Sequence, residues 1–109
     1  MTWEVTFYSE KVMKNVLQWP AGIKAKFIHI MNLIEKYGPV DVGMPFVKSM
    51  GDGLFEIRAK GKEGIGRAFF CSIKEKRVIV LHEIIKKTQK TPTKELKIAR
   101  KRLSEVKND

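Results

Sequence analysis

The pattern of hydrophobic and polar positions changes along the chain from the period of a strand to that of a helix and back. Residues 3–8 alternate between apolar and polar, which predicts a short half-buried strand. Three apolar side chains share one side of that strand and are expected to face the core: Trp3, Val5 and Phe7. The chain therefore begins with a strand that needs a covering layer on one face.

A pair of helices is predicted next. Ser9 has the side chain of a helix N-cap, and residues 10–19 carry an apolar stripe that ends before Pro20. Residues 21–37 repeat apolar side chains at helical spacing until Gly38-Pro39 stops the helix. So short a connection predicts an antiparallel helical hairpin that covers a sheet.

The second half of the chain predicts three strands followed by a helix. The first two strands cover residues 54–60 and 67–73, and the third begins at Arg77 and is apolar on both faces over residues 78–81. Residues 39–53 predict a loop because glycine and proline interrupt every period, and residues 60–64 predict a mobile hairpin loop longer than two residues. Beyond the strands, Thr91 is expected to cap a C-terminal helix with Pro92 at its first position.

These elements predict a single α+β domain over residues 1–109. It consists of an N-terminal strand, a helical hairpin, a three-stranded antiparallel β-meander that completes a four-stranded sheet, and a C-terminal helix.

Charge is distributed unevenly over this fold. Of the net charge of +10, nine units lie in residues 54–109, where 16 Lys and Arg stand against 7 Asp and Glu. Such asymmetry favours an acidic partner such as nucleic acid, although a basic face that only aids solubility is the simpler alternative. There is no stretch typical of a membrane span or a signal peptide, and the single cysteine, Cys71, indicates a reducing compartment, so we expect the cytoplasm and no membrane partner.

The candidate chemistry is cationic. His29 and His82 lie far apart in the sequence, and neither they nor the carboxylates form an acid–base or metal-binding motif. What remains is a set of cations on and after the predicted strands: Arg58, Lys60, Arg67, Lys86, Lys87 and Lys90. Such a set can stabilise charge on a phosphate while RNA supplies its own 2′-hydroxyl nucleophile. Composition alone does not separate cleavage from passive phosphate binding.

Several segments together resemble one family. They are Gly53-Leu54-Phe55-Glu56-Ile57-Arg58, Gly66-Arg67 before an apolar strand, and Val80-Leu81-His82 followed by Ile85-Lys86-Lys87-Thr88-Gln89-Lys90-Thr91-Pro92. With Ala99 in a basic C-terminal helix, the chain resembles the RelE/ParE toxin superfamily, in particular its phage-derived HigB-like branch. Ile85 departs from the Phe that many relatives carry, and we expect this to alter packing or base stacking.

The resemblance implies a toxin that cleaves mRNA codons in the ribosomal A site and leaves a 2′,3′-cyclic phosphate. It implies no metal and no cofactor. It also implies a cognate antitoxin, commonly a helix-turn-helix protein of the HigA type, beside the 70S ribosome and mRNA as partners. By motif match the catalytic residues would be Arg58, Lys60, Arg67, Lys86 and Lys87, with Arg67 on the transition-state phosphate and a lysine as acid or base. The nucleic-acid-binding residues would be Lys62, His82, Gln89, Lys90 and Lys94.

Two rival functions remain open at this point. The same scaffold could act on a protein, as in ParE-like inhibitors of DNA gyrase, which do not need a basic cleft. It could also be a non-enzymatic nucleic-acid-binding module, which would show salt-sensitive RNA binding without cleavage.

Overall fold

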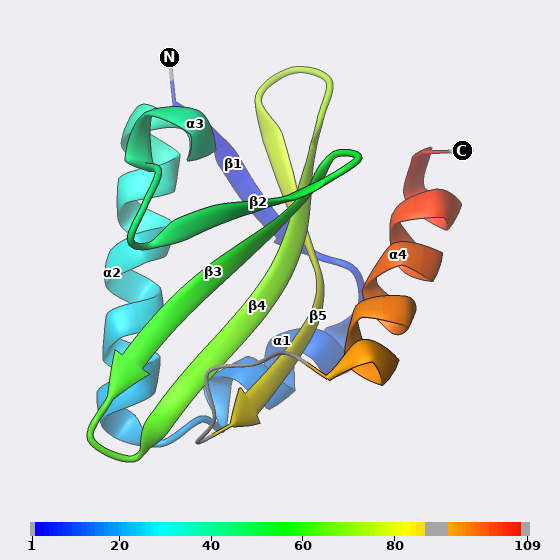
Figure 1. Ribbon diagram of the computed structural model, residues 1–109. Helices are drawn as coiled ribbons and strands as arrows, with labels where there is room; N and C mark the ends of the chain where they lie inside the picture. The colour runs from blue at the N-terminus through cyan, green and yellow to red at the C-terminus, as the bar shows by residue number, and fades with distance from the viewer. Residues whose placement is uncertain (1, 87–91, 108–109) are drawn as a thin grey trace.

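The computed structural model describes residues 2–86 and 92–107, and it shows a five-stranded mixed sheet with helices on both faces (Figure 1). The strands lie in the order β1-β5-β4-β3-β2. Along the chain the elements are β1 (Glu4–Phe7), α1 (Glu10–Leu17), α2 (Ala21–Tyr37), α3 (Pro39–Val42), β2 (Val47–Gly51), β3 (Leu54–Gly61), β4 (Gly64–Ile73), β5 (Arg77–Lys86) and α4 (Thr93–Lys107). The predicted α+β class and the helical hairpin are confirmed.

The first face of the sheet is covered by α1 and α2. Ser9 accepts a hydrogen bond from the backbone N–H of Val12 at 3.2 Å, so the predicted N-cap of α1 is confirmed. The apolar stripe of α2 is fully buried over Ile23, Phe27, Ile30 and Ile34. The side chains of Trp3, Val5 and Phe7 pack against the same core, as the alternation of β1 predicts.

The second face is covered by α4 over part of its length (Figure 1). Ala99 and Leu103 of α4 pack on Leu54, Phe69, Cys71 and Leu81 of the sheet. The Arg102 guanidinium adds a polar link, because its Nη1 donates to the Leu81 carbonyl at 2.7 Å. Because α4 covers only part of this face, part of β3 and β4 on the same face is not covered by the helix.

The sheet has five strands instead of the predicted four. Val47–Gly51 forms β2, which pairs antiparallel with β3 from Val47 opposite Ile57 to Gly51 opposite Leu54. The segment was expected to be a loop because glycines and prolines interrupt it, and a register shift between Ser49 and Gly51 hides its alternation further. β2 and β3 form a hairpin through Asp52 and Gly53, and this cross-strand pairing overrides the loop signal.

The β3–β4 hairpin also differs from the prediction. Gly61 pairs with Gly64, so Lys62 and Glu63 form a two-residue turn in place of the expected longer, mobile loop. At the other end of the sheet, β1 pairs parallel with β5, which places β5 between β1 and β4. β5 is thus an interior strand, as expected. It is also covered on both faces, because Val78 and Val80 belong to the core under α1 and α2 and Leu81 belongs to the core under α4.

At its N-terminus, α4 begins one residue later than expected. The Pro92 carbonyl accepts from the backbone N–H of Glu95 at 3.1 Å, so Pro92 precedes the first turn and Thr93 opens it. The predicted cap, Thr91, lies outside the described residues. None of the helices in the described part of the chain is long and apolar enough to cross a membrane.

Candidate nucleic-acid interface

Polar side chains of β3 share the face of the sheet that carries α4. Alternation along the strand places Leu54, Glu56, Arg58 and Lys60 on this face. Leu54 is buried beneath α4, whereas Lys60 at the far end of the strand is exposed. The strand therefore runs from the core out to solvent, and Arg58 and Lys60 lie on the part of this face that α4 does not cover.

A buried carboxylate organises these cations. The Glu56 side chain is 1% exposed, and its Oε1 accepts from Arg58 Nε at 2.8 Å and from Arg67 Nη1 at 3.3 Å. Arg58 and Arg67 lie opposite each other on β3 and β4. One carboxylate thus offsets the mutual repulsion of two neighbouring guanidinium groups and fixes the orientation of Arg58.

The two arginines differ in their access to solvent. The Arg58 side chain is 30% exposed, whereas that of Arg67 is 0% exposed. Arg67 was expected to contact the scissile phosphate, but in this conformation it lies beneath the surface and contacts Glu56 instead. Its burial suits a positioning role, and direct contact with a phosphate stays a prediction.

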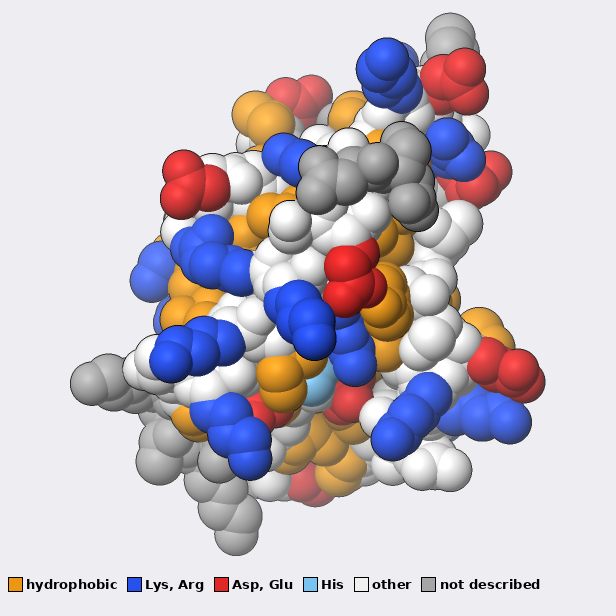
Figure 2. Space-filling model, turned by 90° about the vertical axis from the view of Figure 1, so that its right-hand side faces the viewer, with side chains coloured by type: hydrophobic (Ala, Val, Ile, Leu, Met, Phe, Trp, Pro, Cys, Tyr) orange, Lys and Arg blue, Asp and Glu red, His pale blue; other side chains and the backbone are white. Residues whose placement is uncertain are grey.

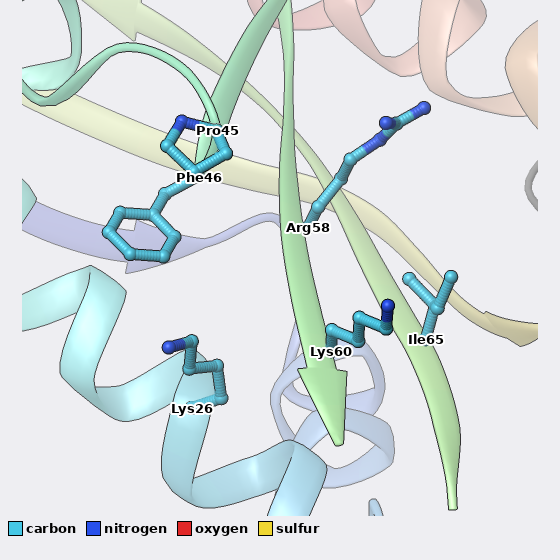
Figure 3. Close-up of a pocket in the computed structure, with 6 residues that line it drawn as sticks. All are labelled: Lys26, Pro45, Phe46, Arg58, Lys60 and Ile65. Atoms are coloured by element: carbon cyan, nitrogen blue, oxygen red, sulfur yellow. The ribbon is translucent and has the colours of Figure 1, made fainter. Parts of the chain in front are cut away.

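Arg58 and Lys60 line a cavity of about 410 Å³ at the edge of the sheet (Figure 3). The other lining residues are Lys26, Pro45, Phe46 and Ile65. Figure 3 shows the Arg58 and Lys60 side chains on one side of β3, with Lys26 and Phe46 on the other. The cavity therefore extends around the edge of β3, at the end of the strand that β2 does not reach.

An aromatic ring lies on the far side of this cavity. The Lys26 ammonium lies 4.9 Å from the centroid of the Phe46 ring, and the His29 ring meets Phe46 edge-on at 6.4 Å between centroids. These contacts and its packing against the first core hold Phe46 in place. His29 itself is exposed, as the sequence predicts.

His82 is linked to the start of α4. Its Nε2 lies 2.8 Å from Glu95 Oε1, and the two side chains are 13% and 20% exposed. The imidazole also stacks on Phe69 with an interplanar angle of 17°. His82 therefore has the contacts of a structural residue that ties β5 to α4, and its predicted contact with nucleic acid is untested.

The remaining predicted site residues are either exposed away from the cavity or lie outside the residues that the structure describes. Lys62 is exposed in the β3–β4 turn, and Lys94 is exposed in the first turn of α4. Figure 2 shows that Lys and Arg side chains form much of the charged surface on the side that carries α4. The predicted roles of Lys87, Gln89 and Lys90, and of the Lys86 side chain, fall outside the described residues.

Three residues of the site were not identified from the sequence. Glu56 was assigned to the polar side of β3, but nothing in the local pattern showed that it would be buried between two arginines. Phe46 and Lys26 come from the segment expected to be a loop and from α2, far in sequence from the basic strands. The hydrogen bond from Arg58 N to the Phe46 carbonyl at 3.0 Å brings Phe46 to the cavity, and the packing of α2 against the sheet brings Lys26 there.

The chain is similar to known proteins in both sequence and fold. The sequence pattern of phage-derived Gp49-like proteins matches residues 14–104. Among solved structures, the chain is similar to a chain of the archaeal RelE–RelB complex from Pyrococcus horikoshii OT3, with a TM-score of 0.55 and 22% identity. That likeness covers 78% of this chain and 96% of the archaeal one. No curated protein matches significantly. The expected RelE-like fold and the phage-derived branch are thus confirmed.

Proposed function

The chain belongs to the phage-derived Gp49-like family, and from this premise we propose that it is the toxin of a type II toxin–antitoxin pair. Its activity would be ribosome-dependent cleavage of mRNA in the A site, within the cytoplasm. The fold shared with a chain of the RelE–RelB complex supports the class of protein. The site described above supports the chemistry.

One observation carries the proposal. Arg58 is fixed through its Nε by a buried carboxylate 2.8 Å away, yet remains 30% exposed beside Lys60 at an open cavity. A guanidinium that is oriented before substrate arrives can stabilise charge on a phosphate without reorganising during the reaction. Passive electrostatic binding would not require such fixation, because exposed lysines on flexible stems suffice for it.

The proposed reaction needs no group that RNA and this chain do not supply. The 2′-oxygen of one nucleotide attacks the adjacent phosphorus as its proton passes to a base. The bond from phosphorus to the 5′-oxygen breaks, and that oxygen takes up a proton, leaving a 2′,3′-cyclic phosphate and a 5′-hydroxyl. Arg58 would neutralise the non-bridging oxygens. A lysine would serve as acid or base in this exchange, and Lys60 is the described lysine nearest in the strand to Arg58.

The proposed partners are the 70S ribosome with its mRNA and a cognate antitoxin. The similar archaeal chain was solved in a RelE–RelB complex, which supports a protein partner of the antitoxin kind. A helix-turn-helix antitoxin of the HigA type, encoded beside the toxin, is the form that the resemblance implies.

Primer extension on a reporter mRNA after brief induction tests the proposal. We expect cuts within translated codons that disappear when the start codon is removed, because only translated mRNA reaches the A site. Cuts that persist without translation would show a ribosome-independent nuclease. Intact mRNA with continuing translation and a rise in DNA-damage signalling would favour the gyrase inhibitor instead.

A further inference from the structure

The cavity around the edge of β3 has two chemically different sides. Arg58 and Lys60 supply cations on one side, and the Phe46 ring with Lys26 lies on the other (Figure 3). A single-stranded nucleotide has the same division, with a charged phosphate and a flat base. The volume of about 410 Å³ lies within the range of roughly 300–1,000 Å³ that is common for small-ligand sites.

Phe46 has the properties of a stacking platform. Bases stack on aromatic side chains whatever their sequence, and neighbouring cations add to the attraction. Lys26 lies 4.9 Å from the ring centroid, and its ammonium can also meet a phosphate or a base oxygen. The ring is held in place by the apolar core behind it, so little conformational freedom would be lost on stacking.

The edge of β3 adds polar groups of fixed geometry between the two sides. Arg58 N donates to the Phe46 carbonyl, and alternation directs the N–H and C=O of Lys60 toward the same edge. In the described part of the chain, the pairing of β2 with β3 ends at Val47 and Ile57, so no β2 residue stands opposite Lys60. These backbone groups are available to pair with the edge of a base.

We infer that this cavity is a base-binding subsite for a nucleotide adjacent to the scissile phosphate, with Phe46 as its platform. The inference rests on the proposed function and deepens it, since the subsite would set which base is preferred beside the cut. Arg58 and Lys60 hold the phosphates, and the strand of RNA crosses the edge of β3 so that one base reaches Phe46.

Mapping the 5′ ends of cleaved transcripts tests this subsite. Phe46→Leu keeps an apolar side chain for the core but removes the aromatic face, and Phe46→Trp keeps the face. We expect Phe46→Leu to cleave about 10-fold or more slowly, as the loss of one stacked base predicts, and to lose the base preference at one position beside the cut. Phe46→Trp should retain both the rate and a preference at that position.

Tyr37 provides a matched control. Its ring carries the Lys36 ammonium at 5.2 Å, like the pair of Phe46 and Lys26, but it lies at the end of α2 and does not line the cavity. Tyr37→Leu should therefore cleave like the parent. A Phe46→Leu protein that keeps the parent base preference, or an equal loss in Tyr37→Leu, would overturn the subsite. If the parent protein makes no cuts at all, the proposed function fails first, and the two failures are thereby distinguished.

Discussion

Glu56 and Arg58 lie two residues apart on one strand, and the buried carboxylate of the first holds the partly exposed guanidinium of the second at 2.8 Å. Because their side chains share a face, the pair extends from the interior to the surface at the cavity. Charge-assisted bonds of this kind are short and directional. The relationship links the fold to the candidate site, since a buried carboxylate determines where a partly exposed cation is held.

Replacing the buried carboxylate should harm both stability and activity. Glu56→Ala removes the buried carboxylate that Arg67 Nη1 contacts at 3.3 Å, and we expect a loss of about 3–5 kcal/mol in the free energy of unfolding. Urea denaturation measures that loss. Glu63→Ala is the control, because this exposed carboxylate lies in the turn of the same hairpin and should cost less than about 1 kcal/mol. Equal losses in the two variants would show that Glu56 does not hold the cluster together.

The different burial of the two arginines predicts different responses to salt. Each phosphate contact with a single strand contributes about 0.7 to the slope of log Kd against log salt concentration. Arg58→Ala should lower that slope by about 0.7 at little cost in stability, measured with a short 2′-O-methyl RNA. Arg67→Met should destabilise the fold and leave the slope unchanged, because its guanidinium is buried. A lower slope for Arg67→Met would show that Arg67 reaches the RNA after all.

A side chain at Gly66 is predicted to lower the stability of the fold. A Cβ at this position would lie 2.6 Å from the Trp19 ring and 2.7 Å from Ile23, so the helical hairpin would have to move away from β4. We expect Gly66→Ala to destabilise the protein by about 1–3 kcal/mol through overpacking, measured by thermal or urea unfolding. At Gly22 the nearest group is the flexible Glu63 carboxylate, so Gly22→Ala should change stability by about 0.5 kcal/mol or less. Equal tolerance at both glycines would contradict the close approach of Trp19 to β4.

Cys71 should be inert in the folded protein. Burial of this β4 residue beneath α4 raises the pKa of its thiol, so at pH 8 less of the reactive thiolate is present than for a free cysteine. We expect iodoacetamide to alkylate the native chain at least about 100-fold more slowly than the denatured chain, as an opening cost of about 3 kcal/mol implies. Mass spectrometry measures both rates. Fast alkylation of the native chain would mean that α4 separates readily from the sheet.

The sequence was sufficient for the elements whose periods are strong. The stripe of α2 and the alternation of β1 and β3 each point to one arrangement, and all three are present in the structure. The pattern missed β2 because the glycines and prolines around it are typical of a loop, and because the register shift between Ser49 and Gly51 interrupts its alternation. The tight β3–β4 turn was missed because several glycines and charged residues there suit a longer loop equally well.

The site was predictable only in part for a related reason. Charge distribution and family resemblance indicated Arg58 and Lys60, which do lie together at the cavity. Burial depends on how elements pack, and neither the charge of Arg67 nor its position in β4 revealed that Glu56 and Arg67 would be enclosed together. Phe46 carried no signal of its own, since an aromatic residue near Pro45 in an irregular segment is most often only packing.

Primer extension on a translated reporter mRNA, with matched charge deletions, tests the proposed mRNA cleavage most directly. Arg58→Ala removes the oriented guanidinium, whereas Lys14→Ala removes a cation that is 64% exposed on α1 and pairs only with the exposed Glu10 in the described contacts. We expect A-site cuts for the parent and Lys14→Ala, and a loss of about 100-fold or more in cutting for Arg58→Ala, the usual effect of removing one charge-stabilising donor. Undiminished cutting by a stably folded Arg58→Ala protein would contradict this expectation.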